Sequence, residues 1–282
     1  MTFGKSGDGP SLVWHWGRGL SDTICLHSST EVPGTPLVID IHCHILPEVD
    51  DGPKSWEVSV EMCRMAAADG VTHMVATPHS NDRYHFDPEY LAGCVRKLQE
   101  MVGDLPRLSL GCDFHLSYDN LQRVLAQPEL YTIGGASYLL VELSDYSIPT
   151  QIADCFLRLG DRGVTPIITH PERNAILRQT PQRVIEFVEL GCAIQVTANA
   201  LTGFWGQRVG RVATWLLEHE AVHVIASDAH DAKHRTPILS QVRTVVTEMV
   251  GEEIANALLE ENPWAVVSGL PLPYSPKPAL KG

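Results

Sequence analysis

The sequence contains no apolar run that approaches the roughly 18 residues needed to span a membrane. Residues 1–36 also lack the basic segment and long apolar stretch that mark a secretory signal. Basic residues are few, with 21 Lys and Arg against 34 Asp and Glu, and the net charge is −13. This balance argues against a nucleic-acid backbone as the main partner. We therefore expect no membrane span and no nucleic-acid partner.

The cysteines do not form a paired framework. There are seven of them, an odd number, and none has C-x-x-C spacing. Cys63, Cys112 and Cys192 lie inside apolar runs. This distribution is typical of reduced core thiols in a cytosolic protein. The predicted location is therefore the cytoplasm.

The chain divides by composition into two parts. Residues 1–36 are rich in Gly, Ser, Thr and Pro without sustained periodicity, which predicts an N-terminal extension that is flexible or lies on the surface. Residues 37–282 alternate strand-like and helix-like patterns. The length allows one α/β barrel or two smaller domains. The regular alternation favours one barrel, since such barrels run to roughly 250 residues.

Strand-like runs in this second part are continuously apolar, as expected when both faces of a parallel sheet are buried. After the first run (LVIDIHCH), strands are predicted at 71–78, 108–113, 138–142, 164–169, 193–197 and 222–226. Helices are predicted from Ser55 to Gly70 and at 87–102, 118–126, 149–162, 180–190, 206–219, 236–249 and 251–260. Seven strands and at least as many helices predict a seven-stranded relative of the eight-stranded α/β barrel. An open doubly wound sheet is the alternative.

Metal-ligand residue types stand at the ends of these strand-like runs. They are His42 and His44, His79, Asp113, Glu142, His170, and Asp228 with His230. Successive positions are about 28 to 35 residues apart, the length of one strand–loop–helix–loop unit, and the last gap is two such steps with Asn199 between. Residues that recur with this period can meet on one rim of a barrel. The pattern therefore predicts a metallohydrolase.

The first strand is followed by a loop that can add a further ligand. Side chains two residues apart point to the same face of a strand, so His42 and His44 share one face. The chain continues as ILPEVDDGPKS. There Asp50 and Asp51, next to a turn-forming Gly-Pro, can fold back over the strand ends.

The motifs D-I-H-C-H, D-D-G-P-K-S, T-P-H, V-E, H-P-E-R and S-D-A-H occur in this order. Together they resemble the PHP (polymerase and histidinol phosphatase) superfamily. The match is closer to its branch of manganese-dependent bacterial protein-tyrosine phosphatases of capsule and exopolysaccharide clusters, and it covers roughly residues 38–269. The resemblance implies a distorted (β/α)7 TIM-like barrel with three divalent ions at the C-terminal ends of the strands.

The resemblance also implies which residues hold each ion. His42, His44 and Asp228 would bind one ion, Glu142 and His170 a second, and Asp51, His79 and His230 a third. Asp51 rather than Asp50 is selected by this correspondence. Asp113 stands where the family usually has a bridging glutamate, and its side chain is one methylene shorter. Whether it still spans two ions stays open.

The implied ligands are five imidazoles and four carboxylates without a thiolate, which suits manganese, iron or zinc better than a soft metal. The resemblance favours manganese. Arg173 and Arg235 match basic residues of the phosphatase branch, and planar guanidinium groups suit bidentate phosphate binding. Arg173, Arg235 and Asp228 are thus the candidate catalytic residues.

The predicted function is that of a metal-dependent phosphomonoesterase, a protein-tyrosine phosphatase acting on the tail of a bacterial tyrosine kinase in the control of polysaccharide export. No cysteine is followed six residues later by arginine, so the phosphate loop of cysteine-based phosphatases is absent. A small-molecule phosphatase, such as histidinol-phosphate phosphatase, is the first alternative. A catalytically silent PHP binding module is the second alternative. A homo-oligomer is compatible with each of these functions.

Overall fold

The computed structural model describes residues 38–278. The predicted extension at residues 1–36 lies outside this range. None of the described helices combines the length and the apolar character that crossing a membrane requires.

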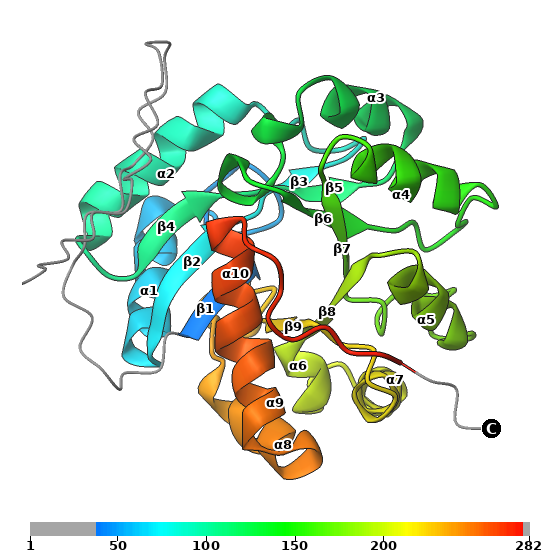
Figure 1. Cartoon of the computed structure of the whole chain (residues 1–282). Helices are drawn as coiled ribbons and strands as arrows, with labels where there is room; N and C mark the ends of the chain where they lie inside the picture. Colours follow the sequence, from blue (N-terminus) through cyan, green and yellow to red (C-terminus); the bar gives the residue numbers. More distant parts are fainter. Residues whose placement is uncertain (1–37, 279–282) are drawn as a thin grey trace, which may run out of the picture. The chain divides into compact units, whose positions relative to one another are not determined.

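The described strands all pair in parallel (Figure 1). One sheet has the order β1-β2-β4 and the other the order β3-β5-β6-β7-β8-β9. The strands are β1 (Val38–Cys43), β2 (Val71–Ala76), β3 (His79–Ser80), β4 (Arg107–Leu110), β5 (Asp113–His115), β6 (Tyr138–Glu142), β7 (Thr165–Thr169), β8 (Ala193–Thr197) and β9 (Val224–Ala226). An all-parallel sheet needs a crossover after each strand, which the helices supply.

The strand predicted at 71–78 ends at Ala76 and a further strand begins at His79, and the strand predicted at 108–113 is broken between Leu110 and Asp113, which corrects the sequence interpretation. β3 continues the line of β2, and β5 continues the line of β4. Backbone hydrogen bonds connect the two lines across the breaks: the Gly111 NH donates to the Ala76 carbonyl (2.9 Å), and the Asp113 NH donates to the Pro78 carbonyl (3.1 Å). Pro78 has no NH group and interrupts the ladder at the first break. A Cβ atom at Gly111 would lie 3.0 Å from the Val75 side chain, so a larger residue at the second break would crowd this side chain.

With these continuations the two sheets supply seven strand positions. The last position also contacts the first: Cys43 and Ala229 form a parallel bridge. The Asp228 NH donates to the His42 carbonyl and the His44 NH to the Ala229 carbonyl, each at 2.8 Å. The α/β TIM-like character that the sequence predicts is confirmed by this arrangement.

Helices separate the strands and pack against them around the large hydrophobic core. They are α1 (Trp56–Ala68), α2 (Pro88–Val102), α3 (Tyr118–Ala126), α4 (Ile152–Gly160), α5 (Gln182–Glu189), α6 (Ala198–Leu201), α7 (Gln207–Glu218), α8 (Ser240–Val250), α9 (Glu252–Asn256) and α10 (Asn262–Ser268). Two short 3-10 helices, η1 (Pro128–Leu130) and η2 (Ile133–Gly135), and a π-helical segment, η3 (Ala257–Glu261), complete the set. Helix starts follow their caps: Asp87 accepts from the Tyr90 NH at 3.1 Å, with Pro88 as the first helical residue.

The C-terminal helices differ from the sequence prediction. The first begins at Ser240 rather than at 236, where the carboxylate of Asp69 accepts from the NH groups of Leu239 (2.7 Å) and Ser240 (2.9 Å). The second runs beyond residue 260, because η3 and α10 continue α9 as one orange-to-red helix as far as Ser268 (Figure 1). Gly269 then ends it in the left-handed conformation, with φ of 66°.

A smaller apolar cluster occupies the ring of strands. Leu140 of β6, Ile167 of β7 and Val224 of β9 meet there with Val75 of β2 and with Val266 of α10. Side chains from strands this far apart can meet only where they point toward a shared interior. The C-terminal ends of the same strands carry polar side chains instead, and these form the site.

Candidate metal centre

The nine predicted ligands converge. They fall into four overlapping groups in which one donor atom from each residue lies within 4.8 Å of the others. The groups are His44–Asp51–His79–His230, His42–Asp113–His170, His42–His44–Asp228 and His79–Asp113–Glu142. Residues from seven segments of the chain therefore share one pocket of donor atoms at one end of the strands.

Strand pairing explains part of this convergence. His79 and Asp113 are register partners in β3 and β5, and His79 Nδ1 lies 3.1 Å from Asp113 Oδ2. His115 and Glu142 are partners in β5 and β6, with His115 Nδ1 3.6 Å from Glu142 Oε2. His115 thus lies at the edge of the cluster, although the sequence analysis did not include it.

The spacing between donor atoms matches a coordination shell. Two ligands about 2.1 Å from one ion and about 90–110° apart lie about 3.0–3.5 Å from each other. Asp228 Oδ1 is 3.4 Å from His42 Nε2 and 3.6 Å from His44 Nε2. Asp51 Oδ1 is 3.4 Å from Nε2 of both His79 and His230. These separations exceed ordinary hydrogen bonds and fit groups arranged around a shared cation.

Several donor atoms are buried without a hydrogen-bond partner. They include Nε2 of His42, Nε2 of His44, Nδ1 of His79 and Oδ2 of Asp113. A buried polar atom without a partner costs about 1–3 kcal/mol, so such a set needs a ligand. Divalent cations satisfy nitrogen and carboxylate donors together. The residues present therefore fit a metal centre.

The two histidines of β1 are oriented by neighbours that hold their other ring nitrogen. His42 Nδ1 lies 3.0 Å from Gln195 Oε1, and His44 Nδ1 lies 2.7 Å from Asp50 Oδ2. Each contact leaves Nε2 directed into the cluster, which is the usual support for a metal-binding imidazole. Gln195 was missed by the sequence analysis, although it is a polar residue within an apolar strand run.

Asp50 and Asp51 have different surroundings in the structure. Besides His44, Asp50 also accepts hydrogen bonds from the backbone NH groups of Gly52 (2.9 Å) and His79 (3.2 Å). It is buried, whereas the Asp51 side chain is 48% exposed and reaches His79 and His230. A Cβ at Gly52 would lie 2.8 Å from the His44 carbonyl, so this turn needs glycine.

Two of the donor residues adopt strained backbone conformations. His170 has φ of 35° and Asp228 has φ of 52°, in the left-handed region that side chains other than glycine rarely adopt. Each such residue costs on the order of 1–3 kcal/mol and concentrates at functional sites. The fold thus holds these two side chains in place against a local preference.

The cluster has strong internal electrostatics. Burial alone would raise the pKa of Asp228, but the Arg173 guanidinium and the His42 imidazole outweigh it and hold this pKa well below its usual value. Burial lowers the pKa of His42, yet the Asp228 and Asp113 carboxylates raise it to about 9. For Asp113, burial is likewise outweighed by His42 and His79, and the pKa stays well below the usual range. Carboxylates and cationic groups here stabilise each other's charged forms.

The two predicted arginines lie at one edge of the cluster and share Asp228. Arg173 Nη1 donates to Asp228 Oδ2, and Arg235 Nη2 is 2.5 Å from the same oxygen. Both guanidinium groups also lie over the ring of Trp205, with Cζ to centroid distances of 4.4 Å for Arg173 and 5.4 Å for Arg235. Trp205 was not foreseen. The one sequence signal for a role of Trp205 in the site is its position in the segment after a predicted strand.

The chain also has close similarity to known proteins. The family described as capsular polysaccharide synthesis, CpsB/CapC, matches residues 38–268. Tyrosine-protein phosphatase YwqE of Bacillus subtilis is 32% identical over 226 residues, which is 79% of this chain and 89% of that protein. Tyrosine-protein phosphatase CpsB of Streptococcus pneumoniae is 30% identical over 239 residues, 82% of this chain and 98% of that protein.

Solved structures agree with these matches. A chain from the crystal structures of YwqE and CpsB, described there as unique metal-dependent tyrosine phosphatases, superposes with a TM-score of 0.80 at 30% identity. That superposition covers 86% of this chain and 100% of the other. Histidinol phosphate phosphatase of Lactococcus lactis superposes with a TM-score of 0.51 at 13% identity over 76% of this chain and 94% of that one, which is a likeness of fold alone.

Proposed function

The chain belongs to the capsular polysaccharide synthesis CpsB/CapC family, and from this we propose that it is a metal-dependent phosphomonoesterase that hydrolyses phosphotyrosine in proteins. The observation that carries the proposal is the convergence of nine nitrogen and oxygen donors with two arginines at their edge. The named activity of the relatives YwqE and CpsB supports the same reaction.

We propose three divalent ions, with manganese favoured. His42, His44 and Asp228 would hold the first, His170 and Glu142 the second, and Asp51, His79 and His230 the third. Asp113 belongs to one donor group with His42 and His170 and to another with His79 and Glu142, which supports a bridging position despite its shorter side chain. When bound, such ions neutralise phosphoryl oxygens and lower the pKa of water to about 7.

Arg173 and Arg235 would bind the phosphoryl group. Each guanidinium has more N–H donors than Asp228 uses, and the remaining ones are free for phosphate oxygens. Their planar form suits two parallel hydrogen bonds to one phosphate. Asp228 and the Trp205 ring restrict both groups before the substrate arrives, which reduces the entropy cost of orienting them.

The chain's residues also account for the charge problem of the reaction. A phosphate ester and its attacking hydroxide are both negative, so the site must provide positive charge. The two arginines supply positive charge on one side. On the other side, the imidazoles would hold the positively charged ions. Stabilising charge that develops during displacement is the main contribution expected from such groups.

The proposed substrate is the phosphorylated tail of a bacterial tyrosine kinase that controls polysaccharide export. The proposed location is the cytoplasm, which agrees with the six free cysteines of the described part of the chain.

A substrate panel tests this function. The purified protein, loaded with Mn²⁺, is assayed with a phosphotyrosine peptide, histidinol phosphate and a nucleotide, and its metal content is measured. We expect rapid release of phosphate from the peptide. Turnover of histidinol phosphate with an inert peptide would show a small-molecule phosphatase instead. Less than one bound ion per chain and no activity on any substrate would show a silent binding module.

A further inference from the structure

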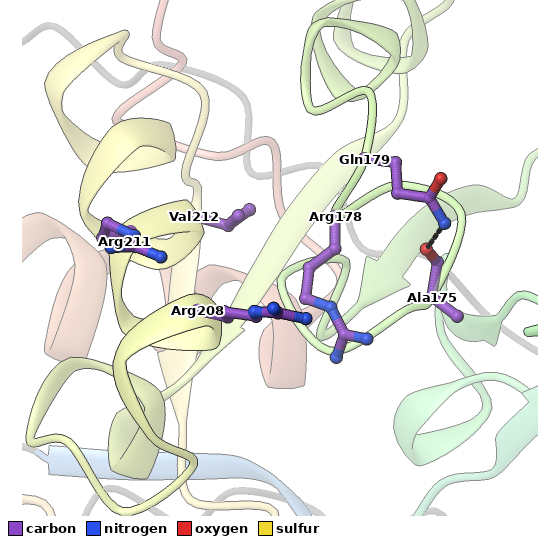
Figure 2. Close-up of a pocket in the computed structure, with 6 residues that line it drawn as sticks. All are labelled: Ala175, Arg178, Gln179, Arg208, Arg211 and Val212. Carbon is purple, nitrogen blue, oxygen red and sulfur yellow. Dashed lines mark hydrogen bonds between the residues drawn. The ribbon is translucent and has the colours of Figure 1, made fainter.

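A cavity of about 370 Å³ lies next to the arginine edge of the site and has a strongly basic lining. Arg178, with Ala175 and Gln179, forms one wall in the loop after β7, and Arg208 and Arg211 with Val212 form the other on α7 (Figure 2). In Figure 2 the side chain of Arg208 points toward the loop that carries Arg178. Three arginines line this cavity and no acidic residue does, in a chain of net charge −13.

The cavity is physically connected to the candidate phosphate-binding arginines. Arg178 Nη1 donates to the backbone carbonyl of Arg173 at 3.1 Å, so one wall belongs to the loop that carries Arg173. The other wall begins at Arg208, three residues after Trp205, whose ring lies against Arg173 and Arg235. The cavity thus lies beside the two segments that carry the candidate phosphate-binding groups.

No carboxylate neutralises the cavity arginines within the described residues. Among the described residues, Arg173 and Arg235 pair with Asp228, and Arg243 pairs with Glu260. Arg178, Arg208 and Arg211 form no such ion pair in that part of the chain.

Helix geometry concentrates this charge further. Arg208 and Arg211 are three residues apart in the first turns of α7 (Gln207–Glu218), so their side chains share one helix face. Like charges at this spacing repel, and the positive end of the helix dipole adds to the repulsion. An anion placed between them removes both costs.

We propose that this cavity is a second anion subsite, which binds an acidic or phosphorylated side chain that neighbours the phosphotyrosine in the substrate. The inference rests on the proposed function and specifies its substrate class as anionic peptides. Guanidinium groups bind carboxylate and phosphate in the same bidentate way. Both kinds of side chain therefore match the lining.

The test uses phosphotyrosine peptides of one sequence whose flanking residues are alanine, glutamate or a second phosphorylated residue. The Mn²⁺-loaded wild-type protein is compared with Arg208→Ala/Arg211→Ala. These two side chains are exposed and make no described hydrogen bond, whereas Arg178 supports the Arg173 loop and is left intact. The matched control is Arg64→Ala/Arg96→Ala, which removes the same charge from exposed positions on α1 and α2.

For the wild type we expect kcat/KM to be about 5- to 10-fold higher with anionic than with alanine flanks. This ratio should approach one in Arg208→Ala/Arg211→Ala and stay at the wild-type value in the control. A larger ratio for the doubly phosphorylated peptide than for the glutamate peptide would identify phosphate as the preferred group. An unchanged ratio in the double variant, or no preference in the wild type, would overturn the subsite.

The outcome separates this inference from the proposed function. Turnover of every phosphotyrosine peptide at equal efficiency would leave the phosphatase intact and remove the subsite. Absence of turnover for all peptides and for free phosphotyrosine, with metal bound, would remove the phosphatase itself.

Discussion

Asp228 connects the two kinds of charge in the site. Its Oδ1 atom faces His42 and His44, while its Oδ2 atom faces Arg173 and Arg235. The carboxylate thus stands between the proposed metal ligands and the proposed phosphate-binding groups. The strained backbone at this residue supports such a function.

Variants of Asp228 and Arg173 should therefore fail in different ways. Asp228→Asn keeps the size of the side chain but removes the charge, and we expect at least about 100-fold lower activity together with loss of bound metal. Arg173→Ala should keep the metal and lower turnover by about 100- to 1,000-fold, because it removes stabilisation of the phosphoryl group. Metal analysis beside steady-state kinetics distinguishes them, with Arg64→Ala as the control. Loss of metal from Arg173→Ala would contradict the assignment.

The short side chain of Asp113 gives a second prediction. Asp113 is fully buried, its Oδ2 lies 3.6 Å from His42 Nε2 and 3.1 Å from His79 Nδ1, and this oxygen lacks a hydrogen-bond partner. If it bridges two ions, Asp113→Glu should change the Mn²⁺ affinity, and we expect about a 10-fold gain. Titration calorimetry with Mn²⁺ measures this change. An affinity equal to that of the wild type would show that residue 113 is not a ligand.

Trp205 is expected to act as a positioning residue for the two arginines. A cation–π contact contributes about 0.5–2 kcal/mol, so Trp205→Ala should lower kcat/KM by about 3- to 30-fold while metal content is retained. Trp205→Phe preserves a ring face and should recover most of the loss. Rescue by phenylalanine, together with a rise in KM larger than the fall in kcat, would indicate positioning of the phosphate-binding groups. Equal losses in the two variants would indicate a packing defect only.

At the scale of elements, the broken strands place two of the donors. β3 starts at His79 and β5 at Asp113, directly after the breaks at Pro78 and Gly111. The register between the two short strands then sets His79 opposite Asp113. The breaks are thus part of the construction of the site.

The pairing of β8 with β9 depends on a buried neutral histidine. His223 precedes β9, its Nδ1 accepts from the Ile194 NH at 3.1 Å, and burial lowers its pKa from the usual 6.5 to about 4. Between these values the unfolded chain takes up a proton that the folded chain does not bind. Stability should therefore be lost as the pH falls from about 6.5 toward 4, by on the order of 1–2 kcal/mol between pH 7 and pH 5.

Replacing this residue separates its contribution from those of other titrating groups. We expect His223→Asn to lower the free energy of unfolding at pH 7 but to show a smaller loss between pH 7 and pH 5 than the wild type. Urea unfolding at both pH values, under the same metal conditions, measures how much unfolding free energy each protein loses between pH 7 and pH 5. The two losses are then compared. The same pH dependence in both proteins would mean that His223 titrates normally in the folded state.

At the scale of the whole molecule, the site joins strands from every part of the described ring. His42 and Gln195 are 153 residues apart in sequence, and their contact links β1 to β8. Bound ions would add links between β1, β3, β5, β6 and the segments after β7 and β9. Metal binding should therefore stabilise the fold as a unit, since ligands that bind only the folded state shift the unfolding equilibrium.

Removal of the metal tests this coupling. A chelator should abolish activity and lower the melting temperature by about 5–10 °C, as expected for the loss of about 3 kcal/mol of binding energy. Added Mn²⁺ should restore both the activity and the melting temperature. Phosphate release measures the first and thermal scanning measures the second. A His42→Ala protein should show a smaller response to Mn²⁺ than the wild type. A melting temperature that is independent of chelator would contradict a shared metal centre.

The sequence by itself determined the family and the order and kind of most elements, and it indicated nine candidate donor residues. These are local properties: apolar runs of strand or helix period, and metal-ligand side chains at the ends of the strands. Only the tertiary structure decided which donors share a group, that Asp50 and Gln195 orient the histidines, and that Trp205 lies against both arginines. It also decided the strand breaks and the basic cavity. Each of these depends on contacts between segments far apart in the chain, and such contacts exist only once the strands form their ring.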